Sequence, residues 1–158
     1  MLKLYRFSSS TKDYWETWDN GDGTHTVHWG ALGAKGQTKT VKGSPLKESE
    51  KIIQSEIDEL VANGYQPPEH EYRLLIEYSV DGMGAKEDVE KRHRLEDRMN
   101  ETLGWTGLGH CDGGSIGSGT MEVCNFVVDF ETAKQIIEGD LKGTEFEDYT
   151  RIYDEDAE

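Results

Sequence analysis

The sequence is poor in several features that define common protein classes. Its 158 residues include only two cysteines and three prolines, and 34% of them are hydrophobic. Two cysteines are too few for a disulfide scaffold and are typical of a reducing compartment. The chain shows neither an N-terminal signal pattern nor an apolar run near the ~18–20 residues that a membrane span needs. We therefore expect a cytoplasmic protein without membrane contact.

Basic residues are also scarce, and their scarcity is uneven. The chain has 17 Lys and Arg against 32 Asp and Glu, a formal net charge of −15. Residues 1–68 hold eight basic and nine acidic residues, whereas residues 69–158 hold nine and 23. This asymmetry predicts two units with different surfaces. Phosphate backbones repel an acidic protein, so only the near-neutral N-terminal part suits nucleic acid, although solubility alone also favours acidity.

The chain is, by contrast, well supplied with aromatics and glycines. Four tryptophans and seven tyrosines argue against disorder. The most informative stretch is 24–42, in which two alternating runs flank Gly30, Gly33 and Gly36. The two-residue period predicts two strands joined by a tight connection. The glycines indicate backbone that needs positive φ or that packs directly against the Trp29 indole.

This stretch carries a family resemblance. Trp29-Gly30, Leu32-Gly33 and Gly36-Gln37-Thr38 resemble the signature of the WGR domain, and the likeness covers residues 1–66. WGR domains occur in poly(ADP-ribose) polymerases, where they are non-catalytic and contact DNA near a strand break, and in many bacterial proteins. The resemblance implies a small antiparallel sheet with one helix. The arginine of the family motif is Ala31 in this chain.

The N-terminal elements, taken in order, predict a compact α+β unit. Strands are expected over residues 2–7, 12–18 and the two runs around Trp29, with a hairpin signal in Asn20-Gly21-Asp22-Gly23. Ser44-Pro45 is expected to open a helix that stops at Gly64. Its apolar face is predicted to be Leu46, Ser49, Ile53, Ile57 and Leu60. We expect Trp29 to be buried against Ile53 and Ile57.

Pro67-Pro68 and the change in charge mark the predicted boundary, with a domain at 1–66, a linker at 67–71 and an acidic domain at 72–158. In the second domain we expect strands at 72–80, 105–111, 120–128 and 147–153. The expected helices are 85–103, with Ala85, Val89, Met99 and Leu103 on one face, and a shorter one capped by Asp129. The order βαββαβ is that of a ferredoxin-like sandwich. The predicted chain is therefore α+β, WGR-like and then ferredoxin-like.

No motif in the chain indicates catalysis. The sequence has no G-x-S-x-G elbow, no phosphate-loop fingerprint and no zinc-type ligand spacing, so we expect no enzyme, cofactor or metal site. His110, Cys111 and Cys124 are interpreted as ordinary strand residues. Arg92 and Glu96 are interpreted as an i,i+4 ion pair on a helix, with a polar pocket as the alternative.

Two stretches are candidate binding sites. The glycine-rich run 112–119 is expected to be a long hairpin loop, in which Asp112, Ser115 and Ser118 could hold a partner. The second candidate is a strand face carrying Lys35, Gln37 and Lys39 beside Trp29, which would suit phosphate contacts. Lysines that guard an exposed sheet edge are the alternative interpretation of this face.

Two functional hypotheses follow. In the first, the protein is a non-enzymatic interaction protein whose N-terminal unit binds nucleic acid through the Trp29 face. In the second, it is an acidic neutraliser of a basic protein partner, in the manner of bacterial immunity proteins, through the charge of residues 69–158. Neither hypothesis requires a small-molecule cofactor.

Overall fold

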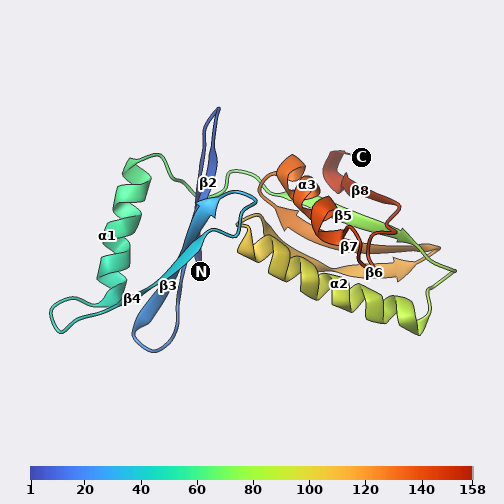
Figure 1. The fold of residues 1–158 in the computed structure, drawn as a ribbon, viewed down its shortest axis with the longest axis horizontal. Helices are drawn as coiled ribbons and strands as arrows, with labels where there is room; N and C mark the ends of the chain where they lie inside the picture. The colour runs from blue at the N-terminus through green and yellow to red at the C-terminus, as the bar shows by residue number, and fades with distance from the viewer. Residues whose placement is uncertain (158) are drawn as a thin grey trace. The chain divides into compact units, whose positions relative to one another are not determined.

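The computed structural model describes residues 1–157 and divides the chain into two compact units, 1–69 and 70–158. The division falls within the proline-containing segment 67–71. Each unit contains one four-stranded antiparallel sheet, and the described residues form three α-helices in all. The chain is therefore mixed α+β (Figure 1).

The N-terminal sheet is a meander of four strands, with spatial order β1-β2-β3-β4. Its strands are β1 (Leu2–Phe7), β2 (Lys12–Asp19), β3 (Thr24–Ala31) and β4 (Gln37–Lys42). The two strands predicted around Trp29 are confirmed as β3 and β4. Gly21 and Gly23 adopt φ of +80° and +85° in the β2–β3 connection, as the hairpin signal predicts.

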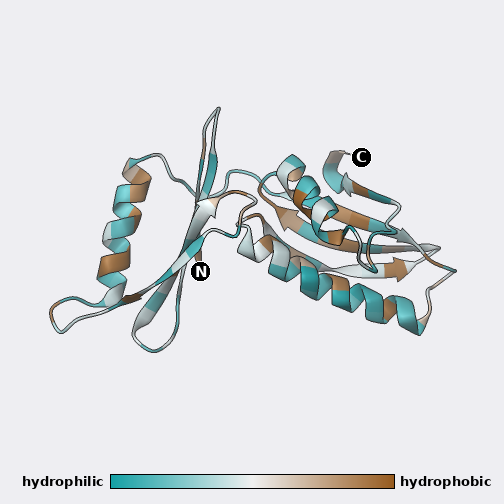
Figure 2. Cartoon of the chain, viewed as in Figure 1, coloured by the Kyte–Doolittle hydropathy of each residue, from teal (hydrophilic) through white to brown (hydrophobic). Residues whose placement is uncertain are grey.

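One helix, α1 (Ser49–Ala62), packs on one face of this sheet. Leu4, Trp15, Val27 and Ile53 form the buried core, and Trp29 and Ile57 pack against it. Figure 2 shows hydrophobic residues recurring along α1. Trp29 packs against this core but is only partly buried, so the prediction that it is substantially buried against Ile53 and Ile57 is wrong. Trp15, at 3% exposure, is the tryptophan that is buried in this core. Trp29 is more exposed because it lies opposite the exposed Gln37 at the start of β4.

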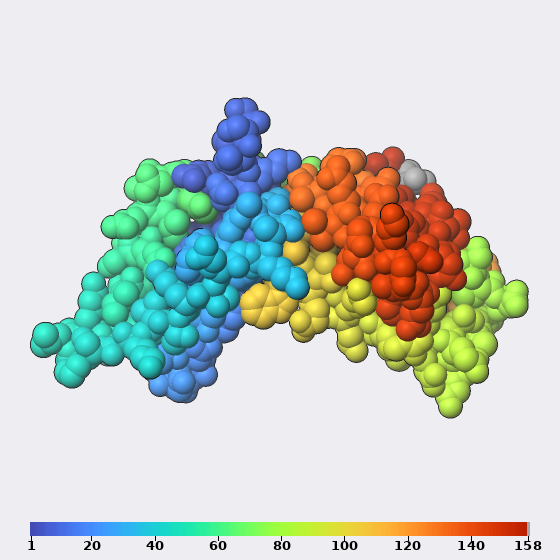
Figure 3. Space-filling model, viewed as in Figure 1, coloured from blue at the N-terminus to red at the C-terminus, as the bar shows by residue number. Residues whose placement is uncertain are grey.

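The prediction that Ser44 opens the helix is wrong. The Ser44 hydroxyl accepts from the amides of Leu46 and Lys47 within a turn closed by Ser44–Lys47 backbone bonds, so it is used before the helix begins. Leu46 is 98% exposed instead of lying on the inner face. The connection between β4 and α1 therefore projects from the unit, as its teal atoms show in Figure 3.

The C-terminal end of α1 is terminated as predicted at Gly64. Gly64 has φ of +96°, its amide bonds the Val61 carbonyl, and the Tyr65 amide bonds the Leu60 carbonyl. This pair of bonds is the Schellman arrangement, which needs a left-handed residue that glycine adopts without a Cβ penalty. The chain then returns to the sheet, where Gln66 pairs with Tyr5.

The C-terminal unit has the predicted element order. Its elements are β5 (Tyr72–Ser79), α2 (Lys86–Trp105), β6 (Gly109–Gly117), β7 (Thr120–Val127), α3 (Phe130–Leu141), β8 (Arg151–Asp154) and a 3₁₀ turn η1 (Glu155–Ala157). The four strands are all antiparallel to their neighbours and lie in the order β6-β7-β5-β8. Figure 1 shows α2 and α3 on the same side of this sheet.

The core of the C-terminal unit lies between the sheet and these two helices. Fully buried side chains come from alternate positions of the central strands, Leu74, Ile76, Met121, Val123 and Val127, and from the helices, Leu95, Met99, Leu103, Ala133, Ile137 and Leu141. The predicted inner face of α2 needs correction. Leu95 is at its centre, whereas Ala85 and Val89 are exposed.

Three boundaries in this unit differ from the expectation. Helix α2 continues through Trp105, so the strand expected at 105–111 begins only at Gly109, and the last strand is Arg151–Asp154 instead of 147–153. The long loop expected at 112–119 does not exist. Strand β6 continues to Gly117 because ladder hydrogen bonds need only backbone, and Ser118 and Gly119, with φ of 55° and 87°, make a two-residue turn.

Candidate functional site

Three of the four predicted nucleic-acid-binding residues come together on the helix side of the N-terminal sheet. The register places Gln37 opposite Trp29 and Lys39 opposite Val27. The Lys39 ammonium lies 5.6 Å from the centroid of the Trp29 ring and 3.0 Å from Oε1 of Glu56 on α1. Its charge is therefore already balanced by a carboxylate.

The fourth residue, Lys35, lies outside β4. Gly36, at φ +68°, separates it from the strand, so the alternation of β4 does not extend to it. Its backbone carbonyl accepts from His28, whose side chain is on the sheet face opposite Trp29. The structure therefore does not extend the Trp29 face to Lys35 as the alternation predicted.

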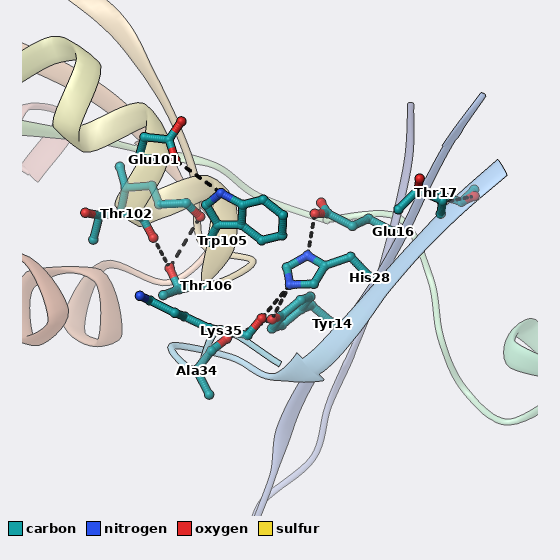
Figure 4. Close-up of polar contacts among 12 residues, drawn as sticks. Tyr14, Glu16, Thr17, His28, Ala34, Lys35, Glu101, Thr102, Trp105 and Thr106 are labelled. Atoms are coloured by element: carbon teal, nitrogen blue, oxygen red, sulfur yellow. Dashed lines mark hydrogen bonds and ion pairs between the residues drawn. The ribbon is translucent and has the colours of Figure 1, made fainter. Parts of the chain in front are cut away.

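A buried polar network occupies that opposite face, as Figure 4 shows. His28 is fully buried, and its Nδ1 lies 2.8 Å from Oε1 of Glu16 while its Nε2 lies 2.5 Å from the Lys35 carbonyl. The Lys35 carbonyl can only accept, so Nε2 is the nitrogen that donates to it. The Tyr14 hydroxyl donates to the Ala34 carbonyl at 2.7 Å. The network holds the β3–β4 connection against the sheet.

The Tyr14 hydroxyl is the titratable donor of this network. Burial, and next the Glu16 carboxylate, raise the pKa of Tyr14 to about 12, so the hydroxyl stays protonated and keeps its donor. Gly36 packs so closely that a Cβ there would lie 2.5 Å from the Tyr14 hydroxyl. The sequence could have revealed this network, since the hairpin at residues 20–23 fixes the pairing of Glu16 with His28.

A cavity of about 640 Å³ lies at the N-terminal end of α1. Its lining includes His25 and Ser49, whose Nδ1 and Oγ are 3.0 Å apart, together with Asp19, Glu48 and Glu50. The sequence does not indicate that His25 and Ser49 form a pair, because they are 24 residues apart and meet only when α1 packs on β3.

This Ser–His pair has the distance of a nucleophile and its base. Catalysis of that kind also needs a third group that orients the imidazole. Within residues 1–157, no side chain bonds Nε2 of His25, and the Asp19 carboxylate accepts from the Gly21 amide instead. The cavity is therefore a polar recess without an assembled hydrolytic triad.

The three predicted partner-binding residues of the C-terminal unit lie on β6 and its turn. Asp112 is at a bulge between Cys111 and Gly114, and Ser115 pairs with Glu122 of β7. Ser118 is in the β6–β7 turn, about 20 Å along the strand from Asp112 at ~3.3 Å per residue. The structure therefore groups Asp112 with Ser115 but separates both from Ser118.

The other polar residues singled out from the sequence have ordinary surroundings. Arg92 and Glu96 form the predicted i,i+4 ion pair at 3.2 Å, although Arg92 Nε is out of line for a hydrogen bond. Burial raises the pKa of the Cys111 thiol to about 11, which keeps it protonated and unreactive. Both cysteines are free, and no cluster of metal-ligating side chains occurs within residues 1–157.

Most cations of the C-terminal unit are held in ion pairs. Seven of its nine basic residues lie within 4 Å of a carboxylate, and only Lys134 and Lys142 form no such pair in the described part of the chain. The shortest are Arg73–Asp156 and Arg94–Glu145, both at 2.6 Å. These pairs involve eight carboxylates, which is fewer than half of the 23 acidic residues in 69–158.

The sequence matches no protein-family model and no curated protein, and no solved structure resembles the chain. In the part of the chain that the structure describes, no helix is long and apolar enough to cross a membrane.

Proposed function

We propose that this chain is a non-enzymatic, two-module binding protein whose acidic C-terminal unit binds and neutralises a basic protein partner. The observation that carries the proposal is the pairing of the cations. Because seven of nine are already held by carboxylates, the unit presents a field that is almost purely negative. Such a field attracts a partner rich in Lys and Arg.

The energetics of the pairs also point to binding. Exposed ion pairs contribute about 0–1 kcal/mol each, so they do not explain why the unit carries so many carboxylates. Excess charge of one sign opposes compactness, whereas charge complementary to a partner speeds association and disfavours wrong partners. We therefore assign the acidic excess to recognition.

The finer fold assignment belongs to the same proposal. The strand order β6-β7-β5-β8, with both helices on one face, supports a ferredoxin-like sandwich for the C-terminal unit. The meander with one packed helix, and the close approach of Gly36 to Tyr14, support a WGR-like N-terminal unit. Both are scaffolds for binding in this proposal, with no chemical step assigned to either.

A salt-dependent capture experiment tests the proposal. The full chain is immobilised and exposed to extract of its native cell, and the bound proteins are identified at about 0.1 M and about 1 M salt, between which the Debye length falls from about 10 Å to about 3 Å. An unrelated acidic protein of similar pI is the control. We expect one basic protein that is retained at low salt by this chain alone and released at high salt. Recovery of no such protein, or recovery indifferent to salt, would refute the proposal.

Nucleic-acid binding by the N-terminal unit is the second candidate. It is favoured by the partly exposed Trp29 ring beside the Lys39 ammonium, and it is opposed by the Glu56 carboxylate that holds that ammonium. Its test is titration of the full chain with nicked duplex DNA at low salt, with Lys39→Gln as the control variant. Phosphate contacts must weaken as salt rises, so affinity that is absent at tens of micromolar, or independent of salt, eliminates it.

A further inference from the structure

The β3–β4 connection, residues 32–36, is fastened to the N-terminal sheet by side chains that can gain or lose a proton. His28 of β3 is fully buried and lies between the Glu16 carboxylate and the Lys35 carbonyl (Figure 4). Its Nδ1 is 2.8 Å from Glu16 Oε1, and its Nε2 is 2.5 Å from the Lys35 oxygen. Because imidazole and carboxylate are both titratable, the fastening depends on how many protons the two groups hold.

The proton on Nε2 is determined by its two neighbours. The Lys35 carbonyl can only accept a hydrogen bond. The Tyr14 hydroxyl, 3.1 Å from Nε2, donates its single proton to the Ala34 carbonyl at 2.7 Å, so it is also an acceptor towards the ring. Two acceptors therefore face Nε2, and only a protonated Nε2 satisfies them.

A second proton lies on the other side of the ring. Nδ1 and Glu16 Oε1 are at hydrogen-bond distance, and either atom can carry the proton between them. Without that proton, a nitrogen lone pair would face a carboxylate lone pair in a buried site. Lys3, the cross-strand partner of Glu16 on β1, forms no ion pair within residues 1–157, so it does not replace the ring as the partner of the carboxylate. The closed network therefore holds two protons on the imidazole and the carboxylate together.

The same face of the N-terminal sheet carries other titratable side chains. By alternation these are Lys3 and Tyr5 on β1, Lys12 and Tyr14 on β2, and Lys42 on β4, and β4 places Thr38 opposite His28. Burial, and next the Glu16 carboxylate, raise the pKa of Tyr14 to about 12, so its hydroxyl keeps its proton below that pH. Lysine and tyrosine side chains ordinarily titrate at about pH 10 and an imidazole at about pH 6.5, so the His28–Glu16 pair is the part of this face that changes charge first as pH rises from neutrality.

Loss of the shared proton must break one of the bonds of the ring. A neutral imidazole has a single N–H. A hydrogen bond to a carboxylate is stronger than one to a neutral carbonyl, so the remaining proton goes to Nδ1. Nε2 then presents a lone pair to the Lys35 carbonyl, and the two acceptors repel each other. Glu16 and His28 are paired residues of adjacent strands, whereas Lys35 lies in the connection, so the connection is the part that moves.

We propose that Glu16 and His28 form a proton-dependent latch on the β3–β4 connection, which is closed while the pair holds the shared proton and opens when a rise in pH removes it. The closed connection binds one proton more than the open one, so opening increases by up to about ten-fold per pH unit. The stabilisation by the latch is complete at low pH and is lost as pH rises. This regulation goes beyond the proposed function and does not depend on the partner of the C-terminal unit.

Amide hydrogen exchange of the full chain, followed by NMR from about pH 6 to about pH 9, tests the latch. Two amides report on the connection: Leu32 donates to the Lys12 carbonyl at 2.8 Å, and Ala34 donates to the Ala31 carbonyl at 3.0 Å. After correction for intrinsic exchange, we expect their protection factors to fall by up to about ten-fold per pH unit. The Asn20 amide, which donates to the Thr24 carbonyl in the β2–β3 hairpin, is the internal control whose protection should not change.

A matched pair of variants identifies the proton-sensing group. In the Glu16→Gln variant, the new side-chain amide donates to Nδ1 of a neutral ring, so Nε2 stays protonated without the shared proton. We therefore expect its protection factors to change less than about two-fold over the same range. Glu59→Gln, which neutralises an exposed carboxylate on α1, should keep the wild-type dependence. Ring nitrogen chemical shifts of wild-type His28 need no variant, and we expect the neutral ring to carry its proton on Nδ1.

Each other outcome overturns a defined part of the proposal. Wild-type protection factors that do not change with pH would overturn the latch itself. An equal fall in Glu16→Gln and wild type would show that the pair does not sense the proton. A neutral ring with its proton on Nε2 would show that the connection is not the part released. If thermal unfolding shows that Glu16→Gln has lost its fold, the wild-type protection factors and ring shifts decide alone.

Discussion

Gly36 is the position at which a single methyl group should do the most damage in the N-terminal unit. Its φ is +68°, and a Cβ there would lie 2.1 Å from the Trp29 carbonyl oxygen and 2.5 Å from the Tyr14 hydroxyl. The first of these atoms is backbone of a central strand and cannot move without breaking the sheet. Gly36→Ala must therefore displace the β3–β4 connection.

The magnitude follows from two contributions. A non-glycine residue in the left-handed region costs about 1–2 kcal/mol. Displacing the connection also breaks the bonds from Tyr14 to the Ala34 carbonyl and from His28 to the Lys35 carbonyl, at about 0.5–1.5 kcal/mol each. We expect a loss of about 2–5 kcal/mol from a unit whose size implies roughly 3–10 kcal/mol in total.

Gly21→Ala is the matched control, because Gly21 has φ of +80° but nothing within 4 Å of its Cβ position. It should lose only the conformational part, about 1–2 kcal/mol. Urea unfolding followed by tryptophan fluorescence suits the comparison, since Trp15, Trp18 and Trp29 all lie in the N-terminal unit. If the two variants lose the same stability, the steric argument and the role of the network are both wrong.

Further predictions concern the core, pH and one buried amide. Trp15→Ala should unfold the N-terminal unit, at about 3–5 kcal/mol, and Trp29→Ala should cost less because Trp29 is partly exposed; equal urea midpoints would contradict the burial difference. Since the folded pKa of Tyr14 is raised to about 12 from an ordinary 10, its stabilisation is complete below pH 10 and is lost as pH rises towards 12. The stability difference between wild type and Tyr14→Phe should therefore shrink over that range, and a constant difference would refute the assignment. Asn125→Val should raise the free energy of unfolding of the C-terminal unit by about 1 kcal/mol, because Asn125 Oδ1 is buried without a partner among residues 1–157; a lower free energy of unfolding, measured by urea titration, would show that the amide is needed.

Local signals in the sequence determined the elements and their order. The two-residue period gave β1 to β4 and β5, and Gly64 gave the end of α1, because alternation and glycine geometry act over a few residues. The same signals gave wrong predictions where one local pattern is compatible with two different structures. Ser44 resembles a helix cap but closes a turn, and the glycine-rich 112–119 run resembles a loop but pairs along β7, since only the partner strand supplies its hydrogen bonds.

The candidate sites needed the tertiary structure, because their members are distant in sequence. The composition placed the negative charge in residues 69–158, but only the ion pairs show that Arg73, Arg94 and Arg98 are already neutralised by carboxylates 42 to 83 residues away. Alternation placed Gln37 and Lys39 beside Trp29, but only the packing of α1 brings Glu56 to Lys39. The cross-strand neighbours of Phe126, which are His110 and Arg73, follow from strand register alone. Register is set by pairing over the whole sheet, and a single-chain pattern of period two cannot fix it.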